Sequence, residues 1–173
     1  MASEFSAANT LGGTITAWSN TVQNPNIFDL VIAMTSQIIS LGQDGSYVPN
    51  VVLFNTIDRY KALLIKDKND NYQMPPFVVR TGGKEYTIDG MIVRSNPNVP
   101  ANSLRVFDST KATGYQRKVA IAEISYENAT NFETEVATLK VYERLNLLIR
   151  NVDKNAFMKC TDISAALIAL ATP

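Results

Sequence analysis

The sequence predicts an α+β fold, with helices early in the chain and strands over much of the remainder. An amphipathic helix is expected near residues 27–41, and a short apolar strand follows it. From Phe77 onward the residue pattern is typical of β-strands. In residues 134–149, apolar and polar side chains alternate over an unusual length. The 173 residues suffice for one domain, or for one domain and an extension, with a substantial buried core.

The composition excludes several classes of function. Basic and acidic residues both number 16, and this balance indicates no electrostatic surface for nucleic acid or anionic membrane. The sequence has no histidine, which excludes serine–histidine and cysteine–histidine nucleophiles and histidine-ligated zinc. The single cysteine, Cys160, permits no internal disulfide and fits a reducing compartment. We therefore expect no cofactor and no metal.

No targeting or membrane segment is visible in the sequence. A basic start followed by an apolar run and a small-residue cleavage site is missing, so no secretory signal is expected. The apolar stretches fall short of the roughly 18 residues that a membrane helix needs. These observations predict a soluble protein made in a cytoplasm.

The first helix is predicted to begin near Asn24-Pro25-Asn26, because asparagine caps helices and proline is tolerated in the first turn. Gly42 is expected to end it. Residues 1–6 (MASEFS) resemble a cloning remnant, and residues 7–24 are expected to be irregular. The apolar face of the helix consists of Ile27, Leu30, Val31, Met34, Ile38 and Leu41.

A buried central strand is predicted at Val51–Phe54, because the run is short and uninterrupted by polar residues. Asn55-Thr56 can cap a second helix. That helix has one apolar face, formed by Ile57, Tyr60, Leu63 and Leu64.

Several further strands follow. Phe77–Arg80 and Glu85–Ile88 flank Gly82-Gly83, which is a hairpin signal. A longer strand is predicted at Tyr115–Tyr126, bounded by Gly114 and Asn128. Shorter strands are predicted at Met91–Arg94, Leu104–Phe107 and Ala156–Lys159, and a small helix or tail at Ile163–Ala171.

Residues 134–149 are predicted to form one long strand, although glutamate, leucine and arginine also permit a helix. The period of two is broken on the apolar face by Glu143 alone. At about 3.3 Å per residue the strand would span roughly 50 Å, so we expect it to run out of one globular unit. The apolar positions are Ala137, Leu139, Val141, Leu145, Leu147 and Ile149.

Two loops resemble ligand-binding motifs but lack required residues. Asp67–Asn71 begins like a calcium loop, but Tyr72 and Val78 stand where glycine and glutamate are needed. Thr81–Lys84 resembles a phosphate loop, but Val78 replaces its first glycine and Glu85 follows the lysine. A polar turn and a hairpin turn are the better interpretations.

The late carboxylates Glu133, Glu135 and Glu143 are better explained by charge pairing with Lys140 and Arg144 than by catalysis. Because Glu143 interrupts an apolar face, we expect it to meet a cation or to lie at an interface. Cys160 has no histidine to activate it, and it is expected to be a small buried residue.

The resemblance to a known family rests on an ordered series of segments: Val51–Tyr60, Leu63–Asp67, Asn71-Tyr72, Ile88–Val93, Asn98–Asn102, Leu104–Asp108, Glu123–Ser125, Asn131-Phe132, Val136–Leu145 and Phe157–Lys159. In this order the segments resemble the major capsid proteins of tailed phages, whose fold is named for coliphage Hong Kong ninety-seven. Two departures are a corner without proline after Phe54 and Tyr60 in place of tryptophan; residues 162–173 match no family segment.

The resemblance implies a mixed sheet flanked by helices, the axial domain, at residues 7–114. It implies long antiparallel strands of a peripheral domain at residues 115–149, and a return strand and tail at residues 150–173. The family's N-terminal arm, extended loop and spine helix have no counterpart, which implies a truncated or naturally trimmed subunit. Without that helix the late apolar face would invite self-association, with Leu139, Val141, Glu143, Arg144 and Leu145 at a subunit interface.

The implied function is structural and non-enzymatic: a subunit of a phage or prophage capsid, assembling into hexamers and pentamers around the genome. The implied location is the virion, with assembly in the bacterial cytoplasm. The implied partners are other copies, scaffolding and portal proteins, and packaged DNA without sequence preference, but no membrane. The alternatives are an encapsulin-type nanocompartment shell, a small-molecule-binding domain with a pocket near the loop after Phe54, and a histidine-free enzyme.

Overall fold

The structure is a computed structural model, and it describes residues 9–10, 20, 22–42, 46–67, 69–82, 85–127, 133 and 137–171. The chain divides into two compact units. The body comprises Met1–Lys111 and Ile149–Pro173, and the ribbon comprises Ala112–Leu148.

The body is built around a mixed sheet, whose described part has seven strands in the order β1-β9-β6-β2-β5-β4-β3. The middle strand, β2, runs parallel to β5 and antiparallel to β6. The predicted mixed sheet is therefore confirmed. The bounds are β1 Asn9–Thr10, β2 Val51–Phe54, β3 Val78–Gly82, β4 Glu85–Ile88, β5 Met91–Ser95, β6 Leu104–Phe107 and β9 Phe157–Cys160.

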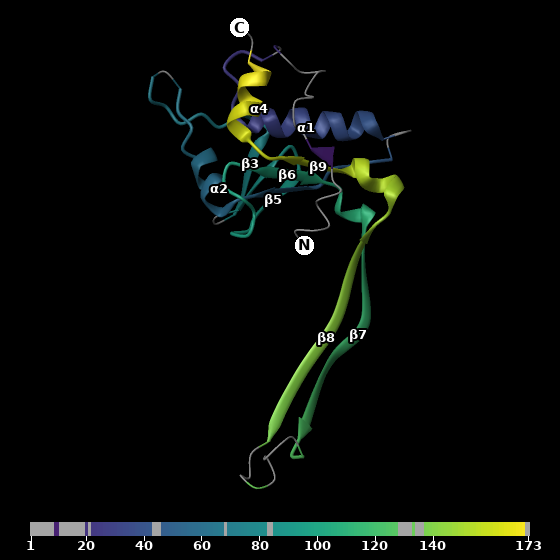
Figure 1. Cartoon of the computed structure of the whole chain (residues 1–173). Coiled ribbons are helices and arrows are strands. Elements are labelled where there is room, and N and C mark those ends of the chain that lie inside the picture. The colour runs from purple at the N-terminus through teal and green to yellow at the C-terminus, as the bar shows by residue number, and fades with distance from the viewer. Residues whose placement is uncertain are drawn as a thin grey trace. The chain divides into compact units, whose positions relative to one another are not determined.

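The core forms where α1 (Ile27–Leu41) lies across one face of this sheet (Figure 1). Val52 and Phe54 of β2 are fully buried, which confirms the predicted central strand. Full burial of such side chains stabilises a fold by roughly 1.5–3 kcal/mol each. The largest buried side chains of α1 are Phe28, Leu30, Met34 and Ile38.

Both ends of α1 lie where the sequence predicts them. The Asn26 side chain accepts hydrogen bonds from the N–H groups of Phe28 and Asp29, and the Asp29 carboxylate accepts one from the Asn26 N–H. This capping box satisfies donors that the first turn leaves free. Gly42 ends the helix with an ordinary negative φ of −79°, not the left-handed conformation expected of a terminal glycine. Its small size matters instead, because a Cβ there would lie 3.0 Å from Cδ2 of Tyr47.

Helix α2 (Thr56–Ala62) is capped by Asn55 as predicted, but its apolar face does not point into the core. Ile57 and Leu64 are each 63% exposed and Tyr60 is 45% exposed, whereas Asp58 and Ala62 are buried. An amphipathic pattern normally places its apolar side against the core. Here the helix packs through a small residue and a carboxylate, and the larger apolar side chains face solvent.

The remaining elements of the body follow the prediction with small shifts. Strands β3 and β4 form the expected antiparallel hairpin. Strand β9 lies beside β6 and is preceded by a 3-10 helix, η4 (Asn151–Ala156). The predicted small helix near the end is α4 (Ile163–Leu170), which contacts α1.

The ribbon consists of two long strands, β7 (Ala112–Ser125) and β8 (Thr138–Ile149), paired only with each other among the described residues. They run in opposite directions (Figure 1). The strand at residues 138–149 confirms the interpretation of the late alternating segment, and the helical alternative is wrong. Strand β7 begins earlier than predicted, so Gly114 lies inside it.

Candidate assembly surfaces

The ribbon exposes several large apolar side chains of β8. Leu139, Val141 and Leu145 are 63%, 64% and 68% exposed. Their spacing of two and four residues places them on one side of the strand. A strand that exposes large apolar residues in a row, with no helix in the described part of the ribbon, is typical of a surface that another chain covers.

The two charged residues of the predicted interface also lie on β8. Glu143 is exposed, and its carboxylate accepts a hydrogen bond from Nε2 of Gln116 at 2.6 Å. Among the described residues Glu143 forms no ion pair, so the expected cationic partner is not found. A cationic partner was expected because a buried carboxylate is costly without one. Glu143 is exposed, so its carboxylate remains hydrated and needs no cation. Arg144 is exposed on the same strand, whereas Glu133 is exposed in the connection and Glu135 lies outside the described residues.

A polar cluster around Tyr142 ties the two strands together. The Tyr142 hydroxyl accepts a hydrogen bond from Nζ of Lys118 at 2.7 Å and donates one to the Glu123 carboxylate at 2.8 Å. The ammonium groups of Lys118 and Lys140 lie 4.4 Å and 5.0 Å from the centre of its ring. The hydrogen bond with Tyr142 raises the pKa of Lys118, and the charge of Glu123 adds to this effect. Cross-strand contacts of this kind hold a ribbon that has little core of its own.

A second exposed apolar surface lies on the outward side of α2. An open groove of about 440 Å³ is lined by Tyr60 of that helix, by side chains of the loop after it and by Arg80 of β3. The ammonium of Lys66 lies 5.2 Å from the centre of the Tyr72 ring at its border. The principal apolar lining residues are Tyr60, Leu63, Leu64, Tyr72 and Met74.

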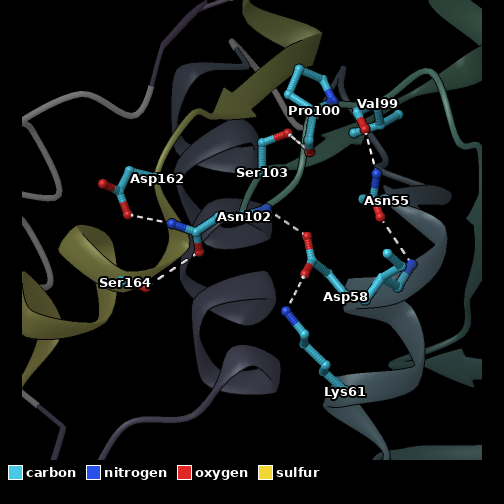
Figure 2. Close-up of polar contacts among 10 residues, drawn as sticks. Asn55, Asp58, Lys61, Val99, Pro100, Asn102, Ser103, Asp162 and Ser164 are labelled. Carbon is cyan, nitrogen blue, oxygen red and sulfur yellow. Dashed lines mark hydrogen bonds and ion pairs between the residues drawn. The ribbon is translucent and has the colours of Figure 1, made fainter.

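The inner side of α2 is joined to the rest of the body by a polar network (Figure 2). The buried Asp58 carboxylate accepts a hydrogen bond from the backbone N–H of Asn102 at 2.6 Å, and Nζ of Lys61 lies 3.4 Å from its other oxygen. The Asn102 side chain donates to the Asp162 carboxylate at 2.8 Å, and its oxygen accepts from the Ser164 hydroxyl at 3.3 Å. One loop residue thus connects α2 with the start of α4.

Asn55 and Ser103 hold the same loop, between β5 and β6, by further hydrogen bonds. The Asn55 side chain accepts the Ile57 N–H at 2.9 Å and donates to the Val99 carbonyl at 2.6 Å. Ser103 donates its hydroxyl to the Pro100 carbonyl at 2.6 Å. The loop between β5 and β6 is therefore anchored at several points.

An open groove of about 580 Å³ beside this network bears on the small-molecule alternative. Its polar lining includes Asp58, Lys61, Asn102 and Ser164, which already bind one another. A ligand site needs a few polar groups that converge on empty space. Here the polar groups satisfy each other, so the groove does not favour the small-molecule alternative.

A third network fixes the segments of the body where the chain leaves at Lys111 and returns at Ile149. The buried Asp108 carboxylate accepts hydrogen bonds from the N–H of Val48 at 3.0 Å and from the N–H and hydroxyl of Thr110 at 2.9 Å and 2.6 Å. Burial by itself would raise the pKa of Asp108. The hydrogen bonds from Thr110 and Val48 and the charge of Lys111 outweigh burial, and the pKa is lowered.

Further contacts brace the same region. The Tyr47 hydroxyl donates to the Val152 carbonyl at 2.8 Å, and the Arg150 guanidinium pairs with Asp153 at 2.7 Å. Asn50 and Ser109 exchange two hydrogen bonds of 2.9 Å.

The first of the two loops that resemble ligand motifs is a polar turn in the structure, as predicted. The Asp67 carboxylate accepts the N–H groups of Asn69 and Asn71, which lowers its pKa and closes a polar turn. Gly83 and Lys84 of the second motif lie outside the described residues. The described ranges contain no cluster of three or more acidic or cysteine side chains that could hold a metal ion, and no helix there is long and apolar enough to cross a membrane. Cys160 is buried as predicted, and burial raises the pKa of its thiol.

Sequence reasoning missed Asp58, Asn102 and Asp108 as organising residues. A signal for Asp108 exists, because Asp108-Ser109-Thr110 directly follows a strand, and aspartate in that position commonly receives hydrogen bonds from the next turn. No comparable signal exists for Asp58 and Asn102, which lie 44 residues apart.

Comparison with known proteins identifies the family. The Phage capsid family matches residues 5–162, which is most of the chain. The chain belongs to the phage capsid family. The resemblance stated from the ordered sequence segments is therefore confirmed.

Solved structures support the same fold. A chain from Mycobacterium phage Bobi is similar with a TM-score of 0.55 and 15% identity, over 90% of this chain and 50% of that one. The capsid of an empty GTA particle gives 0.54 and 15%, over 88% and 53%. A chain from Mycobacterium phage Ogopogo gives 0.53 and 12%, over 90% and 58%. This family member thus spans about half the length of the solved chains it matches, and no curated protein sequence matches it.

Proposed function

We propose that this chain is a shell-forming part of a tailed-phage or prophage major capsid protein. It assembles into hexamers and pentamers of an icosahedral shell that encloses the genome, and it catalyses no reaction. Family membership supports the class of function, and the single structural observation that carries the proposal is the ribbon, which exposes Leu139, Val141 and Leu145 together. Weak contacts repeated over many copies give a strong assembly.

The proposal assigns roles to the parts of the chain. Residues 7–114 act as the axial domain, residues 115–149 as peripheral-domain strands and residues 150–173 as the return strand and tail. The subunit interface includes Leu139, Val141, Glu143, Arg144 and Leu145. Scaffolding and portal proteins and non-specifically held DNA are further partners, and assembly occurs in the bacterial cytoplasm.

Association should increase with concentration and depend on the exposed apolar residues of β8. The test compares wild type, Leu145→Lys and Asn146→Lys by sedimentation velocity and negative-stain microscopy over a range of concentrations. Both variants add one cation at an exposed position of β8. Because positions 145 and 146 are adjacent, their side chains lie on opposite sides of the strand, so only Leu145→Lys changes the apolar side.

Leu145→Lys should weaken association by about tenfold or more, because it places a charge in an apolar contact, whereas Asn146→Lys should change it by less than about threefold. Wild-type chain that stays monomeric at the highest concentrations, alone and together with a full-length capsid protein of the same phage, would overturn the proposal.

A further inference from the structure

One side of β8 concentrates cations, although the chain as a whole has no net charge. Lys140, Tyr142 and Arg144 occupy alternate positions of this strand, so their side chains lie on the same side of it, which we call the polar side. Exposed apolar residues of the same strand, such as Val141 and Leu145, occupy intervening positions and point the other way. The two sides of β8 therefore differ in chemistry, one being apolar and the other cationic.

Lys118 of β7 adds a third cation to the polar side, because its ammonium reaches the Tyr142 hydroxyl at 2.7 Å. The ammonium groups of Lys118 and Lys140 lie 4.4 Å and 5.0 Å from the centre of the same tyrosine ring. Glu123 contributes a carboxylate, which accepts a hydrogen bond from the Tyr142 hydroxyl at 2.8 Å. With Arg144 included, this group has three cations and one acid, a local net charge of +2.

The cations of this group are accessible to a ligand. The side chains of Lys118, Lys140 and Arg144 are all exposed. The hydrogen bond with Tyr142 raises the pKa of Lys118 and the charge of Glu123 adds to this effect, so the ammonium stays protonated at neutral pH. Two ammonium groups beside one ring repel each other, and an anion bound on the polar side would reduce that repulsion.

We infer that the polar side of the ribbon binds the phosphate backbone of nucleic acid through Lys118, Lys140 and Arg144. The inference rests on the proposed function, because a shell that encloses a genome brings its subunits next to nucleic acid, and it names the surface that makes this contact. Successive residues on one side of a strand are about 6.6 Å apart, so neighbouring cations can contact separate phosphate groups.

The contact should be independent of base sequence. The Tyr142 ring is half-buried and already contacts two ammonium groups, so it is not free to stack on a base. Lysine and arginine side chains at phosphate groups position a nucleic acid without reading its sequence. Three such contacts per copy give weak binding, which many copies in one shell would multiply.

An acidic protein segment is the rival ligand for the same cations. Protein interfaces usually have apolar anchors at their centre, surrounded by charged and polar residues. On β8 the exposed Leu139, Val141 and Leu145 lie on the opposite side of the strand from Lys140 and Arg144. Near these two cations the polar side thus offers charge with little apolar surface, which suits phosphate groups better than a protein partner.

Two neighbouring substitutions test which side of the strand binds. Asn146→Lys adds a cation on the polar side, and Leu145→Lys adds the same charge on the apolar side. Fluorescence anisotropy of a short labelled DNA duplex in low-salt buffer measures binding, at concentrations where sedimentation shows every chain to be monomeric. Asn146→Lys should bind about fivefold more tightly than wild type, whereas Leu145→Lys should stay within about twofold. Equal gains in the two variants would show that binding follows net charge and would overturn the inference.

Removal of cations tests the named residues. The chain with Lys140→Gln and Arg144→Gln leaves the Tyr142 hydrogen bonds in place and should bind about tenfold more weakly. The slope of log Kd against log salt concentration should decrease by about 2. The matched control carries Lys66→Gln and Arg80→Gln, which remove the same charge from exposed positions of the body, and should stay within about twofold of wild type. A control that loses as much binding would show that the polar side is not the site.

The remaining outcomes separate this inference from the proposed function. Wild-type chain that associates but does not bind the duplex, even at about 0.1 mM in low salt, would reject the inference and leave the shell function standing. Labelled polyglutamate that binds more tightly than the duplex would likewise reject it, in favour of an acidic protein partner. A chain that binds the duplex through these residues but never associates would support the contact and reject the shell function.

Discussion

The Asp58 carboxylate accepts the backbone N–H of Asn102 at 2.6 Å across a sequence separation of 44 residues. Asn102 has a φ of +58°, a left-handed conformation that asparagine tolerates better than most residues. This conformation lets its backbone face Asp58 while its side chain reaches Asp162. Helix α2, the loop before β6 and the start of α4 are therefore held by one residue.

Removing the Asp58 carboxylate should destabilise the body. Asp58→Ala leaves the Asn102 N–H without its partner, and we expect a loss of about 2–3 kcal/mol in the free energy of unfolding. Urea denaturation monitored by circular dichroism measures it. Lys61→Ala is the matched control, because that exposed ammonium should contribute less than about 1 kcal/mol. Equal losses in the two variants would contradict the dominant role of the Asn102 hydrogen bond.

The outward face of α2 should contribute little to the stability of the isolated body. Ile57→Ala removes an exposed side chain and should change the free energy of unfolding by less than about 0.5 kcal/mol. Val52→Ala in the fully buried part of β2 should cost about 2–3 kcal/mol. Thermal and urea unfolding of both variants distinguish them, and a large loss from Ile57→Ala would mean that the residue is packed inside the body.

The free energy of unfolding should decrease at acidic pH, partly because the Asp108 carboxylate is protonated there. Its pKa in the folded state is lowered, so its contribution is present above the pKa of the unfolded chain, about 3.9, and is lost as the pH falls from there through the folded-state value. The difference in free energy of unfolding between wild type and Asp108→Asn should therefore be constant above about pH 4 and become smaller as the pH is lowered from there. Urea titrations at several pH values give this difference. Glu127→Gln, an exposed change in the ribbon, serves as the comparison, and a difference that stays constant at acidic pH would refute the role of Asp108.

Cys160 should react slowly with thiol reagents while the protein is folded. Its side chain is buried and burial raises its pKa, so both access and the thiolate fraction are reduced. Reaction with a chromogenic disulfide should be at least about a hundredfold slower than that of an exposed thiol introduced by Ser125→Cys, and the two rates should converge in denaturant. Rapid reaction of Cys160 in native buffer would show that β9 opens readily.

Local patterns were sufficient to predict most elements. The alternation in residues 138–149 specifies a strand because successive side chains point to opposite sides, and the long β8 follows from that property alone. Asn26 and Asn55 cap α1 and α2 because their side chains reach N–H groups only two or three residues away. The ordered segments were also sufficient to indicate the family.

The sequence by itself determined which stretches form helices and strands, where several of them begin, and that Cys160 is buried, because these depend on nearby residues and on hydrophobicity. Tertiary structure alone decided that α2 turns Ile57 outward and Asp58 inward, since a helix is oriented by the strands and loops it must join. It also decided the pairing of Asp58 with Asn102 and of Asp108 with Val48. Those hydrogen bonds join residues far apart in the chain, and only the path of the folded backbone brings them within reach.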